Sequence, residues 1–311
     1  MSLRRARSLS ALTTFTSFIF LAAGLVSLLF NAVWHMKLMI SGLLAFASGV
    51  NISFLAALSR KSPSAAVVHS VNLILLPLLP YQLMVISFSI TGLLMTLLSG
   101  RRDFYAGVIA YSYLAPLLAL PYKGVPFFLW LAWSHPVALI YAVSLHSLPK
   151  TYRYKYDRLL AYTSLAAHLY ALLRGEPFFA SLSELLYFLS LRLDKVLPSL
   201  RRVRGEARKA HNYLISAYLL LTPVIVFSFF GLRQLSYLHL LLLGFIGLHV
   251  YGHAPMMLPV IFGVRNARSF TPLPLIMLTL SALTWPFHRE IALYLLLGSL
   301  PLLASIVALE S

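Results

Sequence analysis

Long, uninterrupted apolar runs are the feature that most constrains how this chain can fold. The runs are about 17 to 25 residues long and rich in leucine, and short charged segments separate them. About twenty apolar residues in a helix span the hydrocarbon core of a bilayer, whereas the strands of a membrane β-barrel alternate in polarity. The sequence therefore predicts an all-α fold, a polytopic transmembrane helical bundle.

The composition agrees with lipid as the surrounding solvent. Of the 311 residues, 60% are hydrophobic and only 11% are charged, whereas soluble domains have about 25% charged residues. A soluble fold of this size would lack the polar surface needed to cover its core. The chain has no cysteine, which excludes disulfides, thiolate metal sites, iron–sulfur clusters and cysteine nucleophiles.

The apolar runs fit about eight to twelve spans. They lie near 12–31, 37–58, 64–80, 82–99, 105–121, 125–146, 157–173, 176–193, 211–231, 236–263, 271–286 and 291–308. Residues 64–99 could form two spans that break at Pro80 or one kinked element, and 157–193 could cross the membrane or lie at its interface. The hydrophilic segment 193–210 is predicted to be a basic cytoplasmic linker between an N-terminal transmembrane half, 1–192, and a C-terminal half, 211–311.

Basic residues indicate how the spans are oriented. If the N-terminus is inside and every segment crosses, 20 of the 25 Lys and Arg residues lie on the inner side and 5 on the outer side. Cytoplasmic loops carry such an excess. We therefore predict a multi-pass protein of the cell membrane with both termini in the cytoplasm. The net charge of +17 then reflects topology and contact with anionic membrane lipids, and no nucleic-acid partner is expected.

The two halves share a weak pattern. When the segment from Lys37 is aligned with the segment from His239, Gly42 matches Gly244 and Asn51 matches His253. Both segments are predicted to run inward from the outer side, so a common origin would make them a parallel repeat. Chance matches are common in leucine-rich helices, and both interpretations stay open.

Histidines are the candidate functional residues inside the membrane, where ionisable side chains are costly and mark functional sites. No Asp or Glu is placed convincingly at mid-membrane. The segment 235–264 is predicted to be one helix, and a regular α-helix puts its His239, His249 and His253 on one face, within about 80°. Gly244 and Gly252 accompany them and leave room for a flat macrocycle or for a neighbouring helix.

These histidines suit haem ligation. His239 and His253 are about 21 Å apart along the helix axis, a spacing at which one helix can ligate two stacked haems. His35 is predicted at the depth of His239, and His135 at the depth of His249 and His253, so that each completes a site. The ordinary alternative is that each histidine hydrogen-bonds to a neighbouring helix. The predicted metal ligands are His239, His253, His35 and His249, with haem b as the expected cofactor and copper as an alternative.

Two stretches carry a resemblance to known membrane proteins. Trp34-His35-Met36-Lys37-Leu-Met-Ile-Ser-Gly42 is similar to a WHxHxMxxG motif, and His239-Leu-Leu-Leu-Leu-Gly244-Phe is followed by Gly252-His253-Ala254-Pro255. They resemble the NnrS-type membrane haem–copper proteins and, more distantly, subunit I of the haem–copper oxidases. The resemblance implies a haem-bearing helical bundle with His35, His239 and His253 as ligands. Lys37 stands in place of the second histidine of the motif, so we do not expect a complete haem–copper centre or oxygen reduction.

Three functions are consistent with this sequence. The first is an integral membrane b-type haem protein that transfers electrons, as the membrane subunit of a respiratory or redox complex with a partner redox protein. The second is a secondary transporter or channel with a His-lined pathway, because proline-broken helices and similar halves occur in transporters. The third is a membrane anchor for a soluble or extracellular partner. No nucleotide-binding loop or hydrolase motif is present.

Overall fold

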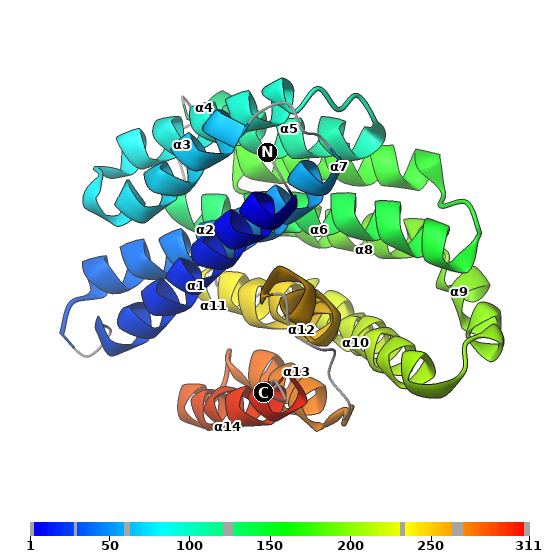
Figure 1. The fold of residues 1–311 in the computed structure, drawn as a ribbon. Coiled ribbons are helices and arrows are strands. Elements are labelled where there is room, and N and C mark those ends of the chain that lie inside the picture. The colour runs from blue at the N-terminus through cyan, green and yellow to red at the C-terminus, as the bar shows by residue number, and fades with distance from the viewer. Residues whose placement is uncertain are drawn as a thin grey trace. The chain divides into compact units, whose positions relative to one another are not determined.

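The protein is helical in every element of the described residues, as a computed structural model shows (Figure 1). The structure describes residues 3–27, 30–58, 63–120, 127–230, 234–262 and 270–307, and no strand occurs among them. This confirms the predicted all-α fold. The basic residues that enter the predicted topology and lie outside the described residues are Arg60, Lys61, Lys123, Arg233, Arg265 and Arg268.

The chain forms two compact units. The N-terminal unit comprises Met1–Val143 together with Leu172–Gly175, and the C-terminal unit comprises Ser144–Ala171 together with Glu176–Ser311. The predicted division into halves at 192 and 211 stays a prediction. The segment 193–210, predicted as a linker, contains two short helices, α9 (Leu193–Ser199) and η2 (Leu200–Arg202), and the first turns of α10.

In the N-terminal unit, prolines and one acidic cap determine where helices begin and end. Its helices are α1 (Leu3–Ser27), α2 (Ala32–Leu58), α3 (Pro63–Leu75), the 3₁₀ turn η1 (Leu76–Leu78), α4 (Tyr81–Leu98), α5 (Phe104–Ala119) and the first part of α6 (Phe127–Tyr152). Pro77 lies inside the 3₁₀ turn, and Pro80 is the N-cap of α4, preceded by the extended residue Leu79, since proline disfavours helical geometry in the residue before it. The segment 64–99 is therefore two helices. Asp103 caps α5 by accepting a 3.0 Å hydrogen bond from the backbone N–H of Ala106.

The C-terminal unit is also a set of packed helices. It contains the end of α6, α7 (Arg158–Arg174), α8 (Pro177–Ser190), α9, η2, α10 (Gly205–Ser228), α11 (Gln234–His239), the π-helical segment η3 (Leu240–Ile246), α12 (Gly247–Phe262), α13 (Leu273–Thr284) and α14 (Arg289–Val307). The helix predicted over 235–264 is thus α11, η3 and α12 in succession. The segment 157–193 forms two helices, α7 and α8.

Six helices in the described part of the chain are long and apolar enough to cross a bilayer. They contain the candidate spans Ser8–Ser27, Val33–Ser53, Tyr81–Leu98, Ala207–Ser228, Ser236–Pro259 and Arg289–Ile306. Shorter apolar helices cover Pro63–Leu78, Phe104–Ala119 and Leu273–Thr284. These helices define a multi-pass membrane protein, and the predicted total of eight to twelve spans stays a prediction.

Helix α4 illustrates how such a span is built. Phe88 and Met84 are fully buried against the rest of the unit, whereas Leu97 on the same helix is 62% exposed. A soluble helix would place polar residues on its outer face. Both faces of α4 are apolar because lipid, and not water, meets the outer one.

Candidate functional site

The predicted histidine helix departs from regular α-helical geometry. Residues Leu240–Ile246 are π-helical, and a π-helical turn holds more residues than an α-helical turn. His239 precedes this segment and His249 follows it, so the regular angle expected between them does not hold. His239 stacks on Trp285, with ring centroids 4.6 Å apart and an interplanar angle of 9°. The expectation that all three histidines share one face assumed a regular helix.

His249 and His253 are brought together on α12. Their rings are parallel within 8°, with centroids 6.4 Å apart. His249 Nδ1 lies 2.8 Å from the carbonyl oxygen of Phe245, and His253 Nδ1 lies 2.8 Å from that of His249. A carbonyl only accepts, so each Nδ1–H donates and each Nε2 carries the lone pair. This is the tautomer in which histidine ligates a metal through Nε2.

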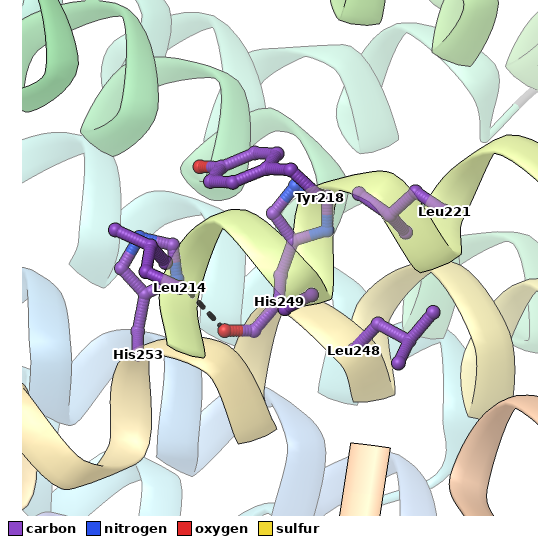
Figure 2. A pocket seen from close by; sticks show the side chains of 7 residues that line it. Leu214, Tyr218, Leu221, Leu248, His249 and His253 are labelled. Carbon is purple, nitrogen blue, oxygen red and sulfur yellow. Dashed lines mark hydrogen bonds between the residues drawn. The ribbon is translucent and has the colours of Figure 1, made fainter. Parts of the chain in front are cut away.

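Tyrosines occupy the space beside these rings. Tyr218 of α10 lies edge-on to both, with centroids 5.3 Å from His249 and 6.0 Å from His253 (Figure 2). Its hydroxyl donates to Ser144 Oγ at 2.8 Å. Tyr187 of α8 donates to His249 Nε2 at 3.2 Å. The His249 lone pair is therefore already engaged by a tyrosine.

The space around these two histidines does not fit a haem. The cavity that Leu214, Ala217, Tyr218, Leu221, Leu248, His249 and His253 line has an empty volume of about 120 Å³ and no room for a water molecule. The predicted cofactor-facing glycines contact α10 instead: a Cβ atom on Gly252 would lie 2.6 Å from Ala217, and one on Gly244 would lie 2.6 Å from Val224. Among the described residues, no three His, Asp or Glu side chains are grouped to hold a metal ion.

His35 and His135 belong to the N-terminal unit, and the structure describes the two units separately. Their predicted pairing with His239 and with His249 and His253 therefore stays a prediction. Within its own unit, His35 is half-buried, and its Nδ1 lies 2.8 Å from the carbonyl oxygen of Gly24, near the end of α1. Lys37, which replaces the second histidine of the motif, donates to the carbonyl oxygen of Leu79 at 3.1 Å. In this structure, both motif residues therefore hydrogen-bond to backbone carbonyl oxygens near the ends of helices.

The C-terminal unit buries a carboxylate that the sequence did not place in the core. Glu184 of α8 and His168 of α7 are fully buried. Their helices are tied together by Ser164 and Ser183, each of which donates to the carbonyl oxygen of the other, at 2.8 and 3.0 Å. Glu184 lies in the segment 157–193, which could cross the membrane or lie at its interface. The sequence therefore did not predict that its side chain is buried.

The N-terminal unit contains a larger buried polar site, centred on His69 of α3. The hydroxyl of Thr91 (α4) donates to the carbonyl oxygen of Ser87 at 2.8 Å, so its oxygen accepts from His69 Nδ1 at 2.8 Å and from Asn72 Nδ2 at 3.0 Å. Ser87 in turn donates to Asn72 Oδ1. With Nδ1 protonated, His69 Nε2 is an acceptor.

Two helices, α2 and α5, supply hydrogen-bond donors to this acceptor. Tyr113 (α5) donates to His69 Nε2 at 3.3 Å, and Ser48 (α2) lies 3.2 Å from the same nitrogen. Asn51 Nδ2 (α2) donates to the Tyr113 hydroxyl at 3.3 Å, and Asn51 Oδ1 accepts from the Tyr105 hydroxyl (α5) at 3.3 Å. The chain Tyr105–Asn51–Tyr113–His69–Thr91 therefore has one continuous donor direction.

His135 of α6 completes the site, and it is the one predicted ligand that lies in it. Its ring is 4.6 Å from that of Tyr113 and 4.8 Å from that of Phe88. Its Nδ1 lies 3.0 Å from Ser112 Oγ, and its Nε2 is buried with no hydrogen-bond partner among the described residues. Ser89 Oγ of α4 is likewise buried without a partner there. We call Ser48, Asn51, His69, Tyr105, Tyr113 and His135 the His69 cluster.

His69 is not among the site residues that the sequence predicts. A pattern that could have revealed it is present. Polar residues repeat at helical spacing within apolar helices, as in Ser48 and Asn51, His69 and Asn72, and Ser87 and Thr91. Residues three or four apart lie on the same helical face. Each pair therefore marks a polar stripe that faces other helices.

Comparison of the chain with protein-family models, with curated proteins and with solved structures finds no match. The fold and the sites define the class to which it belongs: multi-pass α-helical membrane proteins. Within that class, its distinguishing features are the His69 cluster in the N-terminal unit and the His249–His253 pair with Tyr187 and Tyr218 in the C-terminal unit.

Proposed function

We propose that this chain is a membrane transport protein for small, uncharged polar solutes, and that the His69 cluster binds the solute during passage. The observation that carries the proposal is the complete burial of this polar cluster, which helices of one membrane unit share. Polar side chains inside a membrane protein are costly and mark substrate pathways. We further propose a cell-membrane location with both termini in the cytoplasm, which rests on the charge asymmetry of the loops.

The chemistry of the cluster favours a neutral solute over an ion. All of its members are Ser, Asn, His or Tyr. The cation beside the cluster, Arg101, lies over the Tyr105 ring at 4.5 Å and is paired with Asp103. A permeating ion would find no charged cluster member to pair with, and transfer of an unpaired charge into a low dielectric is prohibitive. Hydroxyl and amide groups of a neutral solute can hydrogen-bond to the hydroxyl, amide and imidazole groups of the cluster.

A proton relay is a weaker alternative, because Asn51 interrupts the chain. Tyr105 donates to Asn51 Oδ1, and a different atom of the same amide, Nδ2, donates to Tyr113. An amide side chain has fixed donor and acceptor groups and no readily exchanged proton. A proton that arrived from Tyr105 would not be passed on. Asn51 instead positions the two tyrosine hydroxyls.

The hydrogen bonds of the cluster are strong enough to hold its helices together and weak enough to be exchanged for hydrogen bonds to a solute. Hydrogen bonds between membrane helices contribute about 0.6 kcal/mol each. The eight between different helices named above then sum to about 5 kcal/mol. A solute that replaces several of these bonds offsets much of that cost. His135 Nε2 and Ser89 Oγ, which have no hydrogen-bond partner among the described residues, offer further polar contacts to a bound solute.

The test is uptake by proteoliposomes that contain the purified chain. We expect uptake of radiolabelled glycerol or ribose, and no comparable flux of lactate or potassium. Tyr113→Phe and Asn51→Leu should each slow uptake about tenfold, because each removes a buried polar group that would hydrogen-bond to the solute. His135→Phe should have a similar effect, since it keeps an aromatic ring and removes Nε2.

The matched control is Tyr237→Phe. Tyr237 is also fully buried, and its hydroxyl lies 2.8 Å from Ser181 Oγ and donates to the carbonyl oxygen of Pro177 at 2.7 Å. It belongs to the C-terminal unit, so its loss should not change uptake. Equal uptake by wild type and all cluster variants, or flux of ions alone, would contradict the proposal.

A second candidate function is the b-type haem protein that the sequence suggests. What supports it is the tautomer of the α12 pair: the Nδ1–H groups of His249 and His253 donate to carbonyl oxygens. Axial ligation through Nε2 would require Tyr187 to release His249 and α10 to separate from α12. A Soret band in the purified protein and haem in a pyridine haemochrome assay would support this function, and a colourless protein would refute it.

A further inference from the structure

A pocket lies at the end of α4 in the N-terminal unit, and no residue of the His69 cluster lines it. It has a volume of about 420 Å³ and is lined by Thr96, Leu97, Gly100, Arg101, Arg102, Asp103, Ala106, Gly107 and Ala110. That volume falls within the range of small-ligand sites. Gly100, with φ of +70°, lets the chain turn sharply out of α4 and into the pocket wall.

The polar wall of this pocket is positively charged. It carries two arginines against one aspartate. Arg101 pairs with Asp103 at 2.5 Å, and its guanidinium lies over the ring of Tyr105 at 4.5 Å. Asp103 is engaged further as the cap of α5, through the N–H of Ala106. Arg102 is exposed and has no carboxylate within ion-pair distance among the described residues. A negatively charged ligand would neutralise the net positive charge of this wall.

The other wall is apolar and continues onto the membrane-facing surface. Leu97, Ala106 and Ala110 line it, and Leu97 is 62% exposed. The candidate span Tyr81–Leu98 ends three residues before Arg101. The pocket therefore sits where the hydrocarbon region meets the headgroups. A ligand that fits both walls has a phosphate at one end and an acyl chain at the other.

We propose that this pocket is a specific binding site for the phosphate group of an anionic membrane phospholipid. Arg102 contacts the phosphate, Arg101 adds positive charge to the same wall, and the Leu97 side of the pocket contacts the first part of an acyl chain. In the predicted topology, this end of α4 faces the cytoplasm, and anionic lipids are enriched in that leaflet. The site is separate from solute binding, so it can be tested without measuring flux.

Gly107 allows a direct test. An added Cβ atom on Gly107 would meet nothing within 4 Å, so Gly107→Leu fills the pocket without changing any charge. Arg102→Gln removes the exposed charge and keeps the length of the side chain similar. The experiment titrates full-length protein in neutral detergent with phosphatidylglycerol and counts bound lipid by native mass spectrometry. We expect each variant to bind this lipid about tenfold more weakly than wild type, Arg102→Gln because it loses a charge-assisted contact and Gly107→Leu because its side chain occupies the space of the lipid.

The controls separate a specific site from general attraction to a protein of charge +17. Arg158→Gln removes one exposed charge in the C-terminal unit and should leave binding unchanged. Unfolding midpoints without lipid should not fall below the wild-type value for any variant, which shows that the fold is kept. The proposal is overturned if phosphatidylcholine binds as tightly as phosphatidylglycerol, or if inorganic phosphate alone displaces the lipid at equal concentration. It is also overturned if Arg158→Gln weakens binding as much as Arg102→Gln.

Discussion

At the scale of single residues, the position of Tyr113 depends on the contacts that its neighbours make and on the missing side chain of Gly92. Its ring packs against Phe88 with centroids 5.1 Å apart, and its hydroxyl joins His69 and Asn51. Gly92 on α4 makes this position available, because a Cβ atom there would collide with the Tyr113 ring. A sequence shows Gly92 only as a small residue in an apolar helix. The partner that requires it lies 21 residues away and becomes evident only when helices pack.

Gly92→Ala should therefore disturb the His69 cluster. The added methyl group forces the Tyr113 ring to move, and overpacking of this kind costs about 1–3 kcal/mol. We expect a lower unfolding midpoint and loss of solute uptake. The matched control is Gly107→Ala on α5, where an added Cβ atom meets nothing within 4 Å. That change replaces a helical glycine and should stabilise the protein by up to about 1 kcal/mol. Equal midpoints for the two variants would show that Gly92 is not a close contact.

At the scale of elements, the limits of apolar helices could be predicted because proline and charge mark them. The break at Pro80 was foreseen as one of two alternatives, and α3 and α4 confirm it. The register within 235–264 could not be predicted. The π-helical segment Leu240–Ile246 has no pattern of its own in a leucine run, and it changes the faces on which His239 and His249 lie. The predicted three-histidine face assumed a regular register through this segment and stays a prediction, whereas the helical segment itself is present as α11, η3 and α12.

Deleting Leu243 should turn the π-helical segment into a continuous α-helix, because a π-bulge holds one additional residue. The segments before and after it would then rotate by about 100° relative to each other. Since Gly252 and His249 fix α12 against α10, we expect His239 to lose its stack on Trp285. Near-ultraviolet circular dichroism should report the change, with an unchanged helical content in the far ultraviolet and a lower unfolding midpoint. Leu243→Ala, which keeps the residue count, should retain the tryptophan spectrum. A deletion variant with the wild-type spectrum would contradict this.

At the scale of the whole molecule, composition predicted the environment and the fold class, whereas the sites required tertiary structure. Apolar bulk and short charged loops were sufficient to predict a helical membrane protein. They did not reveal Glu184 or the His69 cluster, since a buried polar residue and a lipid-facing one look alike in a leucine-rich run. Within the membrane, helices are joined by small polar contacts whose partners are distant in sequence. The candidate site was therefore predictable in kind, as intramembrane histidine, and of its members only His135 was predicted as a site residue.

The orientation of the whole chain can be tested directly because it contains no cysteine, so a single introduced cysteine is the only thiol. Lys195→Cys and Arg102→Cys lie on the predicted inner side, and Glu176→Cys and His288→Cys on the predicted outer side. A membrane-impermeant maleimide added to intact cells should label the outer pair at once and the inner pair only after permeabilisation. Glu176 is the decisive position, because α7 and α8 expose it outside only if both cross the bilayer. Labelling of Lys195→Cys in intact cells would reverse the topology, and protection of Glu176→Cys alone would place α7 and α8 at the inner interface.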